Sequence, residues 1–260
     1  MGRTMERRRL RPVRLFSSDL DGTLAGDRDA SRRFSAYWRE LDPETRPLLV
    51  YNSGRLVDDI LSFTQEEGLP AADFVIGGVG TMMACDTVSG MEMEYAEFIA
   101  EGYDAASIAD LVGDFPDMAR QPDRFQHDRK SSWYLHDAST DRLSDLSDRL
   151  EGNGFKVKIV YSSKRDLDIL PANADKGNAL VWLCRKIGVA LDEVIVAGDT
   201  GNDMDMFALE NVRGIIPANG HDELKLRFPE SSRIYQANGH EADGVVEGLR
   251  HWLGQRSAQG

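Results

Sequence analysis

Hydrophobic residues fall into two alternating kinds of segment along most of the chain. Short runs that are mostly apolar predict buried β-strands, at 13–20, 47–52, 73–78, 192–198 and 212–218. Between them, apolar residues recur at helical spacing in the segments 30–41, 54–69, 176–188, 202–210 and 241–253. Strands that are apolar on both faces and alternate with helices are typical of a parallel sheet covered by helices. The pattern therefore predicts an α/β fold with a Rossmann-like parallel sheet core.

The segment 85–171 departs from this pattern and is more polar. Its stretch 155–163 alternates apolar and polar residues, which indicates a sheet with one wet face. Two helices are predicted here, at 103–115 and 140–154. We therefore expect an inserted α+β domain at 85–171, called the cap below, and a core formed by 1–84 and 172–260.

The amino-acid composition limits the kinds of partner that this protein is expected to bind. The formal net charge of −13 disfavours nucleic acid and anionic membranes, and no apolar run approaches the ~18 residues of a membrane span. Cys85 and Cys184 form neither a metal knuckle nor a disulfide framework, and we expect both to be buried thiols. The first 14 residues are rich in arginine and have no apolar stretch, so we expect a solvated tail rather than a secretory signal. These features fit a cytoplasmic location, which we expect for this protein.

Four polar segments lie next to predicted strand ends or helix starts. They read DLDGT (19–23), NSGR (52–55), DKGNA (175–179) and GDTGND (198–203). Ligands of parallel α/β sheets bind at the carboxyl ends of the strands, and a helix start such as that at Lys176 favours an anion. Each segment alone could be an ordinary turn or helix cap, but the four together indicate one site.

Asp19 and Asp21 pose an electrostatic problem. On a strand end they would point the same way, about 6–7 Å apart. Like charges at that distance disfavour each other's ionisation. The segment therefore requires a cation, a shared proton or a solvent-exposed turn, and Asp-Gly is itself a strong turn dipeptide.

Phosphoryl transfer is the chemistry that these side chains suit. One carboxylate can attack phosphorus, and a second can protonate the leaving oxygen and later activate water. A hydroxyl such as Ser53 and an ammonium such as Lys176 can hold phosphoryl oxygens. Asp199 together with Asp19 could bind a hard divalent cation. Because these segments contain no His or Cys, magnesium is favoured over zinc.

In this order, and over nearly the whole chain, the four segments resemble the motifs of the haloacid dehalogenase superfamily. The resemblance implies that Asp19 is the nucleophile and Asp21 the general acid and base. It implies that Ser53, Gly54 and Lys176 bind the phosphoryl group. Where relatives more often have Thr, this chain has Ser53, which keeps the hydroxyl.

The resemblance also implies a magnesium site. Its expected ligands are Asp19, the backbone carbonyl of Asp21, and Asp199. Asn202 and Asp203 are expected to support the metal directly or through water. An insert between the second and third motifs is, in this superfamily, a cap that covers the site and selects the substrate.

A closer resemblance is to the sucrose-phosphate phosphatase branch, which includes mannosylfructose-phosphate phosphatases. It rests on 130–137 (KSSWYLHD), 159–180 and 196–207. It implies an enzyme of carbohydrate metabolism whose small-molecule substrate carries phosphate on the fructosyl half of a non-reducing disaccharide. We expect the protein to be a monomer or weak dimer. Lys130 begins the first of these segments and has no obvious acidic partner, so we expect it to contact the sugar, the alternative being a surface lysine.

Other readings stay open at this stage. A phosphatase of another small sugar phosphate and a sugar phosphomutase would use the same four segments. A sugar-nucleotide glycosyltransferase also holds its metal with D-x-D but does not require the two later segments. A domain that only binds phosphate has little use for both Asp19 and Asp21.

Overall fold

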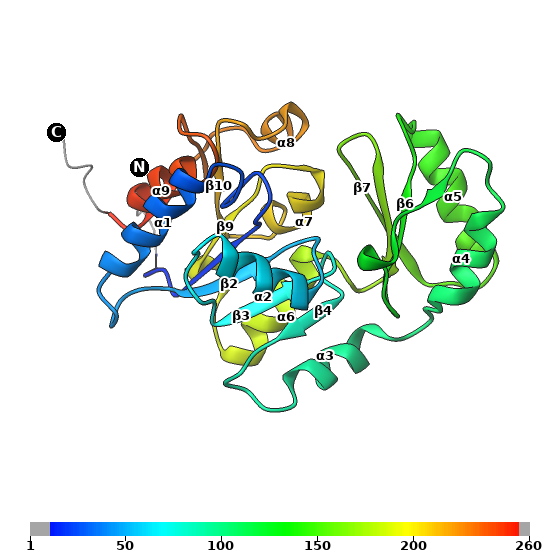
Figure 1. Ribbon diagram of the computed structural model, residues 1–260, viewed down its shortest axis with the longest axis horizontal. Coiled ribbons are helices and arrows are strands. Elements are labelled where there is room, and N and C mark those ends of the chain that lie inside the picture. The colour runs from blue at the N-terminus through cyan, green and yellow to red at the C-terminus, as the bar shows by residue number, and fades with distance from the viewer. Residues whose placement is uncertain (1–10, 255–260) are drawn as a thin grey trace, which may run out of the picture.

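The computed structural model describes residues 11–254, and two β-sheets organise it (Figure 1). The larger sheet has the strand order β11-β10-β9-β1-β2-β3-β4 and is parallel except for the β3–β4 pair. Its strands are β1 (Leu15–Ser18), β2 (Leu48–Asn52), β3 (Phe74–Gly77), β4 (Met82–Ala84), β9 (Val194–Ala197), β10 (Arg213–Ile216) and β11 (Ile234–Gln236). The α/β class predicted from the apolar runs is confirmed.

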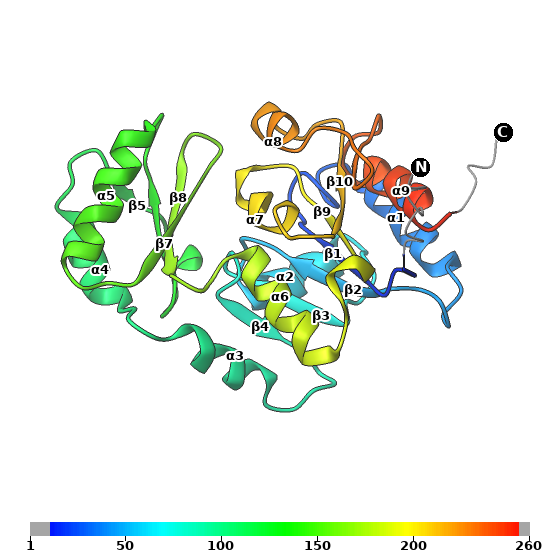
Figure 2. The same ribbon diagram turned by 180° about the vertical axis from the view of Figure 1, so that it is seen from behind.

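Helices cover both faces of this sheet, because successive strand residues point to opposite sides (Figures 1 and 2). Phe16 packs into one cluster with the first set of helices, α1 (Arg28–Glu40), α2 (Val57–Glu66) and α9 (Glu241–Trp252). Leu15, its neighbour, packs into the cluster on the other face. That face carries α3 (Met91–Ile99), α6 (Lys176–Ile187), α7 (Met204–Phe207) and α8 (Asp222–Arg227).

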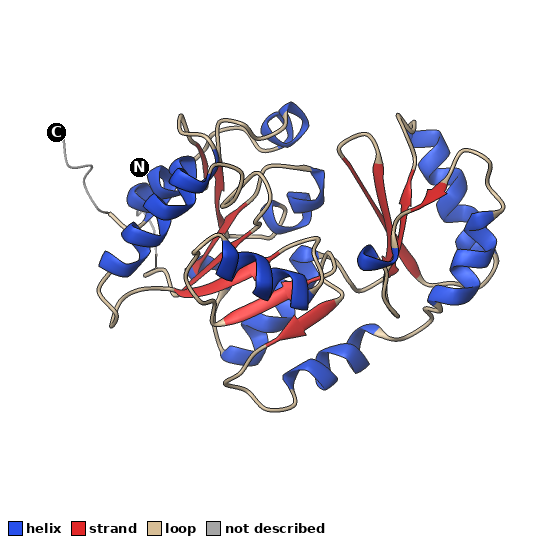
Figure 3. Cartoon of the chain, in the orientation of Figure 1, coloured by secondary structure: helices blue, strands red, loops and turns tan. Residues whose placement is uncertain are grey.

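The smaller sheet lies within 85–171 and is antiparallel, with the order β5-β6-β8-β7. Its elements are α4 (Ala105–Gly113), β5 (Ala119–Arg120), β6 (Ser131–Tyr134), α5 (Thr140–Gly152), β7 (Val157–Ser162) and β8 (Asp166–Pro171). Figure 3 shows both helices on the side away from the larger sheet. Trp133 and Leu167 pack beneath them, so the opposite, more polar face is turned toward the core.

Helix α3 was not predicted, and it packs with the core although it lies within 85–171. Its Tyr95 is buried in the core cluster, donates a hydrogen bond to the carbonyl of Gly80 and packs edge-on against Trp182 of α6. Gly78 and Gly80 have positive φ in the turn between β3 and β4. At Gly80 a β-carbon would lie 2.2 Å from the backbone of Asp175, so this turn touches the start of α6.

The structure also bears on the expectations about membrane spans and about the two cysteines. No helix within residues 11–254 combines the length and the apolar character needed to cross a membrane. Both cysteines are free thiols, but only Cys184 is buried; Cys85 is half-buried. The expected solvated tail lies largely outside the described residues, up to residue 10.

Candidate active site

Three of the four polar segments follow adjacent central strands. β1 lies between β9 and β2, with Ser18 paired in register with Ala197 and with Tyr51. The backbone N–H of Asp19 continues this ladder and donates to the carbonyl of Ala197 at 3.0 Å. Asp199, Asp19 and Ser53 therefore emerge side by side at the carboxyl edge of the sheet, where parallel sheets bind ligands.

Lys176 is the first residue of α6 and is fully buried, which rules out a solvated lysine. The side chain of Asp175 caps this helix by accepting from the N–H of Asn178 at 2.6 Å. The Lys176 ammonium lies 2.9 Å from Asp19 Oδ1 and 2.7 Å from Asp203 Oδ1. Burial disfavours its charge, but the two carboxylates outweigh burial and raise the pKa of Lys176.

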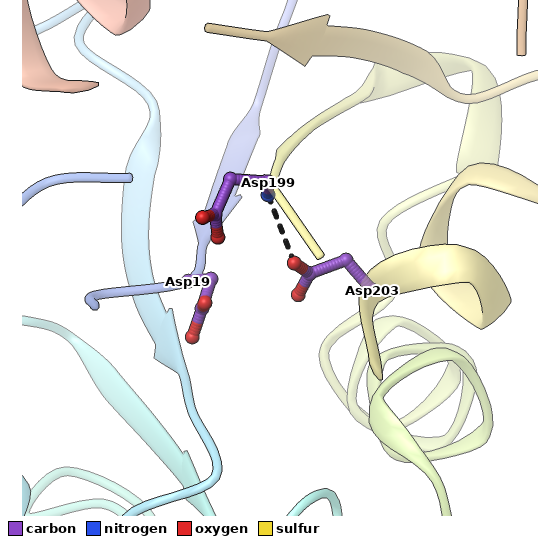
Figure 4. A group of neighbouring side chains, drawn as sticks. All are labelled: Asp19, Asp199 and Asp203. Atoms are coloured by element: carbon purple, nitrogen blue, oxygen red, sulfur yellow. Dashed lines mark hydrogen bonds between the residues drawn. The ribbon is translucent and has the colours of Figure 1, made fainter. Parts of the chain in front are cut away.

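Asp19, Asp199 and Asp203 form a buried acidic cluster with oxygens within 4.8 Å of one another (Figure 4). Burial raises the pKa of Asp19 to about 7, opposed by the charge of Lys176. Burial, followed by repulsion from Asp19 and Asp203, raises the pKa of Asp199 to about 8. The cluster is therefore short of positive charge, since one ammonium faces three carboxyl groups.

The donor set fits a magnesium ion, because it offers only oxygen atoms and would leave two negative charges beside Lys176 when fully ionised. Both oxygens of Asp203 are already engaged: Oδ1 by Lys176, and Oδ2 by the N–H groups of Asp199 and Thr200 at 3.0 and 3.1 Å. Asp203 thus shapes the loop. Oδ2 of Asp19 and Oδ2 of Asp199 accept no hydrogen bond from residues 11–254, which leaves them available to a cation.

Asp21 does not share the strand geometry expected for it, because β1 ends at Ser18. A tight turn follows in which Gly22 has φ +75° and the carbonyl of Leu20 accepts three backbone N–H groups. The Asp21 side chain is 57% exposed, and both of its oxygens accept from the Arg55 guanidinium at 2.8 Å. The Arg55 side chain thus reaches across from the second segment to Asp21 in the first.

The segment NSGR (52–55) contacts both the segment GDTGND (198–203) and the cap. Ser53 is fully buried at the end of β2. A β-carbon on Gly54 would lie 3.8 Å from the side-chain nitrogen of Asn202. The carbonyl of Gly54 also accepts from the Lys130 ammonium at 3.4 Å. Residues that are far apart in sequence therefore line one edge of the site.

Lys130 is not a surface lysine, since only 4% of it is exposed. The expectation that it has no acidic partner is wrong, because its ammonium lies 3.2 Å from Asp168 Oδ1. The pairing of β6 with β8, which places Ser132 opposite Asp168, brings this carboxylate close. From the cap, Lys130 reaches the core beside the catalytic segments.

Two polar residues near the site were not singled out from the sequence. Thr23 donates to Asp199 Oδ1 at 3.2 Å and is part of DLDGT, so the motif itself contained the signal. Lys158 of β7 bridges Asp175 and Asp205 in the core. Its period-2 position indicates only which face of the cap sheet it occupies.

A Rossmann-like core, an inserted α+β domain and this grouping of carboxylates with a buried lysine define a hydrolase of the haloacid dehalogenase type. A family model described as sucrose-6F-phosphate phosphohydrolase matches residues 12–253. The chain belongs to this family of phosphoric monoester hydrolases, as the resemblance of the motifs predicted.

Individual relatives agree with this assignment. The chain is 47% identical to a mannosylfructose-phosphate phosphatase of Agrobacterium fabrum over 94% of its own length and 98% of that protein. It is 30% identical to sucrose-phosphatase 1 of Nicotiana tabacum, covering 92% of this chain but only 59% of the tobacco protein. The X-ray structure of the sucrose-phosphatase from Synechocystis sp. PCC6803, in complex with sucrose and phosphate, superposes with a TM-score of 0.83. That pair is 27% identical, and the match covers 93% of this chain and 98% of the other.

Proposed function

We propose that this protein is a magnesium-dependent phosphatase that hydrolyses the phosphate ester of a non-reducing disaccharide phosphate, either sucrose 6-phosphate or mannosylfructose phosphate. The observation that carries the proposal is the buried Asp19, paired with Lys176 and flanked by Asp199 at the carboxyl edge of the sheet. The relatives that act on such sugar phosphates support the substrate class.

The first chemical step falls to Asp19. Lys176 holds the Asp19 carboxylate in place through Oδ1, and the carboxylate oxygen that does not bind magnesium would attack phosphorus. The new O–P bond forms as the ester bond to the sugar oxygen breaks, which gives an aspartyl phosphate. Ser53 and Lys176 would hold phosphoryl oxygens during the transfer.

Asp21 supplies the proton that the departing sugar oxygen needs. It then removes a proton from water, which attacks phosphorus, releases phosphate and restores the Asp19 carboxylate. In the structure both Asp21 oxygens are occupied by Arg55. Proton transfer therefore requires Asp21 to give up at least one of these hydrogen bonds when substrate arrives.

Magnesium, when bound by Asp19, the Asp21 carbonyl and Asp199, would neutralise phosphoryl charge and help to orient the ester for in-line attack. Asn202 and Asp203 would support that site. The buried cluster of Asp19, Asp199 and Asp203 supports magnesium binding here, because Lys176 alone does not balance its three carboxyl groups.

The cap, 85–171, is proposed to select the substrate. The phosphate and metal are held by the core, so the second sugar ring must reach outward. Lys130 lies between Gly54 and Asp168, where the cap meets the catalytic edge. We propose that Lys130 contacts sugar hydroxyl groups. With a net charge of −13, the protein is proposed to act on this small molecule in the cytoplasm, without nucleic acid or membrane, as a monomer or weak dimer.

The direct test is release of inorganic phosphate from a panel of sugar phosphates that includes both candidate disaccharides. Higher kcat/KM for one of them than for fructose 6-phosphate and glucose 6-phosphate supports the proposal. Preference for a monosaccharide phosphate contradicts the substrate assignment. Transfer of phosphate between positions of one sugar, without release, indicates a phosphomutase.

Replacing Asp21 by Asn should remove the proton donor and leave the nucleophile. General acid–base catalysis commonly contributes about 10²–10⁴-fold, so turnover of a sugar phosphate should fall by that much. An aryl phosphate has a good leaving group and should lose far less. Steady-state kcat on both substrates measures the difference, and equal losses would contradict the acid role.

Replacing Lys130 by Ala should raise KM for the disaccharide phosphate by about 10-fold, which corresponds to about 1.4 kcal/mol. Hydrolysis of a small aryl phosphate should change little, because that substrate does not extend to the cap. Damage to both substrates by the same factor would instead make Lys130 a structural contact through Asp168 and Gly54.

A further inference from the structure

Lys158 joins the cap to the core at a point that the proposed chemistry does not use. It lies on β7, on the face that is turned toward the core, since Val160 of the same face packs in the core cluster. Its ammonium lies 2.7 Å from Asp175 Oδ2 and 2.8 Å from Asp205 Oδ1. The side chain of Lys158 is about one-third exposed, so these pairs are partly shielded from solvent.

The two carboxylates belong to the framework of the catalytic residues. Asp175 is the N-cap of α6, and it holds both the backbone and the side chain of Asn178. Asp205 is the second residue of α7, which follows the 3-10 turn Gly201–Asp203. The two helices touch, since a β-carbon on Gly177 would lie only 2.5 Å from the carbonyl oxygen of Asp205.

This arrangement leaves the core electrostatically incomplete without the cap. Within residues 11–254, Lys158 is the one cation that forms an ion pair with Asp175 or Asp205. Without it, the two carboxylates that now share one ammonium would repel each other where α6 and α7 touch. Their repulsion would act on the residue that follows Asp175, which is Lys176.

We propose that Lys158 is a positioning residue. When the cap lies on the core, Lys158 neutralises Asp175 and Asp205. The start of α6 is thereby fixed, and Lys176 is held against Asp19. This inference rests on the proposed function. It differs from the assignment of Lys130, because Lys158 serves the chemical step on every substrate and not the recognition of one sugar. The catalytic site is then complete only when the cap lies on the core.

The experiment compares Lys158→Met, Lys158→Arg and the double variant Lys158→Met/Asp205→Asn with the wild type. Lys156→Met is the matched control, since Lys156 also pairs with a carboxylate, Glu101, but does so within the cap and at the surface. The substrates are an aryl phosphate and a disaccharide phosphate. Amide hydrogen exchange over 176–179 is followed in parallel on the same proteins.

Lys158→Met should lower kcat roughly 10- to 100-fold on both substrates, the scale of a small misplacement of catalytic groups, with little change in KM. Exchange at the start of α6 should become faster. Lys158→Arg should retain most of the activity, and the added Asp205→Asn should recover part of the loss because it removes the repulsion. The Lys156→Met control should match the wild type.

Several outcomes would overturn the inference. They are unchanged kcat in Lys158→Met, a loss confined to the disaccharide phosphate, or no recovery in the double variant. A wrong substrate assignment would give a different result. The wild type would then hydrolyse the aryl phosphate but neither disaccharide phosphate, and the Lys158 variants could still be compared on the aryl phosphate. If the wild type hydrolysed no phosphate ester, unchanged exchange over 176–179 in Lys158→Met would still overturn the inference.

Discussion

Asp19→Asn should abolish turnover of every phosphate ester and leave no covalent phosphoenzyme. The amide cannot replace the carboxylate that attacks phosphorus, and removing a nucleophile that acts as part of a catalytic unit can cost on the order of 10⁶-fold. The fold should survive, because Lys176 keeps its partner Asp203 at 2.7 Å. Burial already disfavours the Asp19 charge, so a neutral isostere should not destabilise the metal-free protein.

Rapid quenching with labelled substrate, followed by detection of acid-stable protein-bound phosphate, checks the covalent step. Asp29→Asn is the matched control, because Asp29 is an exposed aspartate in the first turn of α1, paired with Arg32. It should behave like the wild type. A phosphoenzyme in Asp19→Asn would mean that another side chain attacks phosphorus, and the assignment of the nucleophile would be wrong.

Removal of divalent metal should have the second large effect. Activity should vanish in EDTA and return with magnesium, since the site offers only oxygen ligands and cannot balance its carboxylates with Lys176 alone. Calcium should restore little, because its larger and looser coordination does not suit in-line transfer. Phosphate release after dialysis and re-addition of each ion measures this effect, and full activity in chelator would contradict the metal assignment.

The pH dependence of magnesium binding follows from the same cluster. Without metal, the pKa values of Asp19 and Asp199 are raised to about 7 and 8, so both groups hold protons to some extent near neutral pH. Binding requires the carboxylates and must release those protons. The apparent affinity for magnesium should therefore rise between pH 6 and pH 8. Titration calorimetry in two buffers of different ionisation enthalpy measures the proton release.

Two glycine variants separate an effect on the metal site from the effect of backbone strain alone. Gly22 and Gly68 have similar positive φ values, +75° and +68°. A β-carbon at Gly22 would lie 2.3 Å from Asp199 Oδ2, whereas nothing lies within 4 Å at Gly68. Both Ala variants should lose some stability from the backbone strain. Only Gly22→Ala should also need a higher magnesium concentration for half-maximal activity; the same requirement in both variants would mean that backbone strain, rather than Asp199, is responsible.

The sequence alone determined the architecture of the core. The runs that became β1, β2, β3, β9 and β10 are apolar on both faces, and only a sheet with helices on both sides buries such strands. The short elements β4, β11 and α8 escaped prediction. Three-residue strands and a six-residue helix are too short to show a period, and their pairing or packing partners define them.

The four polar segments also identified the family, because their residue types and order carry the chemistry. The sequence could not show how those side chains divide the charge between them. In the structure, Asp19 shares Lys176 with Asp203, while Asp21 points outward to Arg55. The end of β1 at Ser18 and the turn at Gly22 produce this difference. A turn of this kind redirects a side chain with no change in the motif's letters.

The ion pairs within the cap, and those between the cap and the core, were decided by the tertiary structure alone. From sequence, Lys130 had no acidic partner and Lys158 was one polar position in an alternating strand. Strand pairing brought Asp168 to Lys130, and the seating of β7 on the core brought Lys158 to Asp175 and Asp205. Ion pairs between residues far apart in the chain leave no local pattern, because the packing of whole elements sets the distance between the charges.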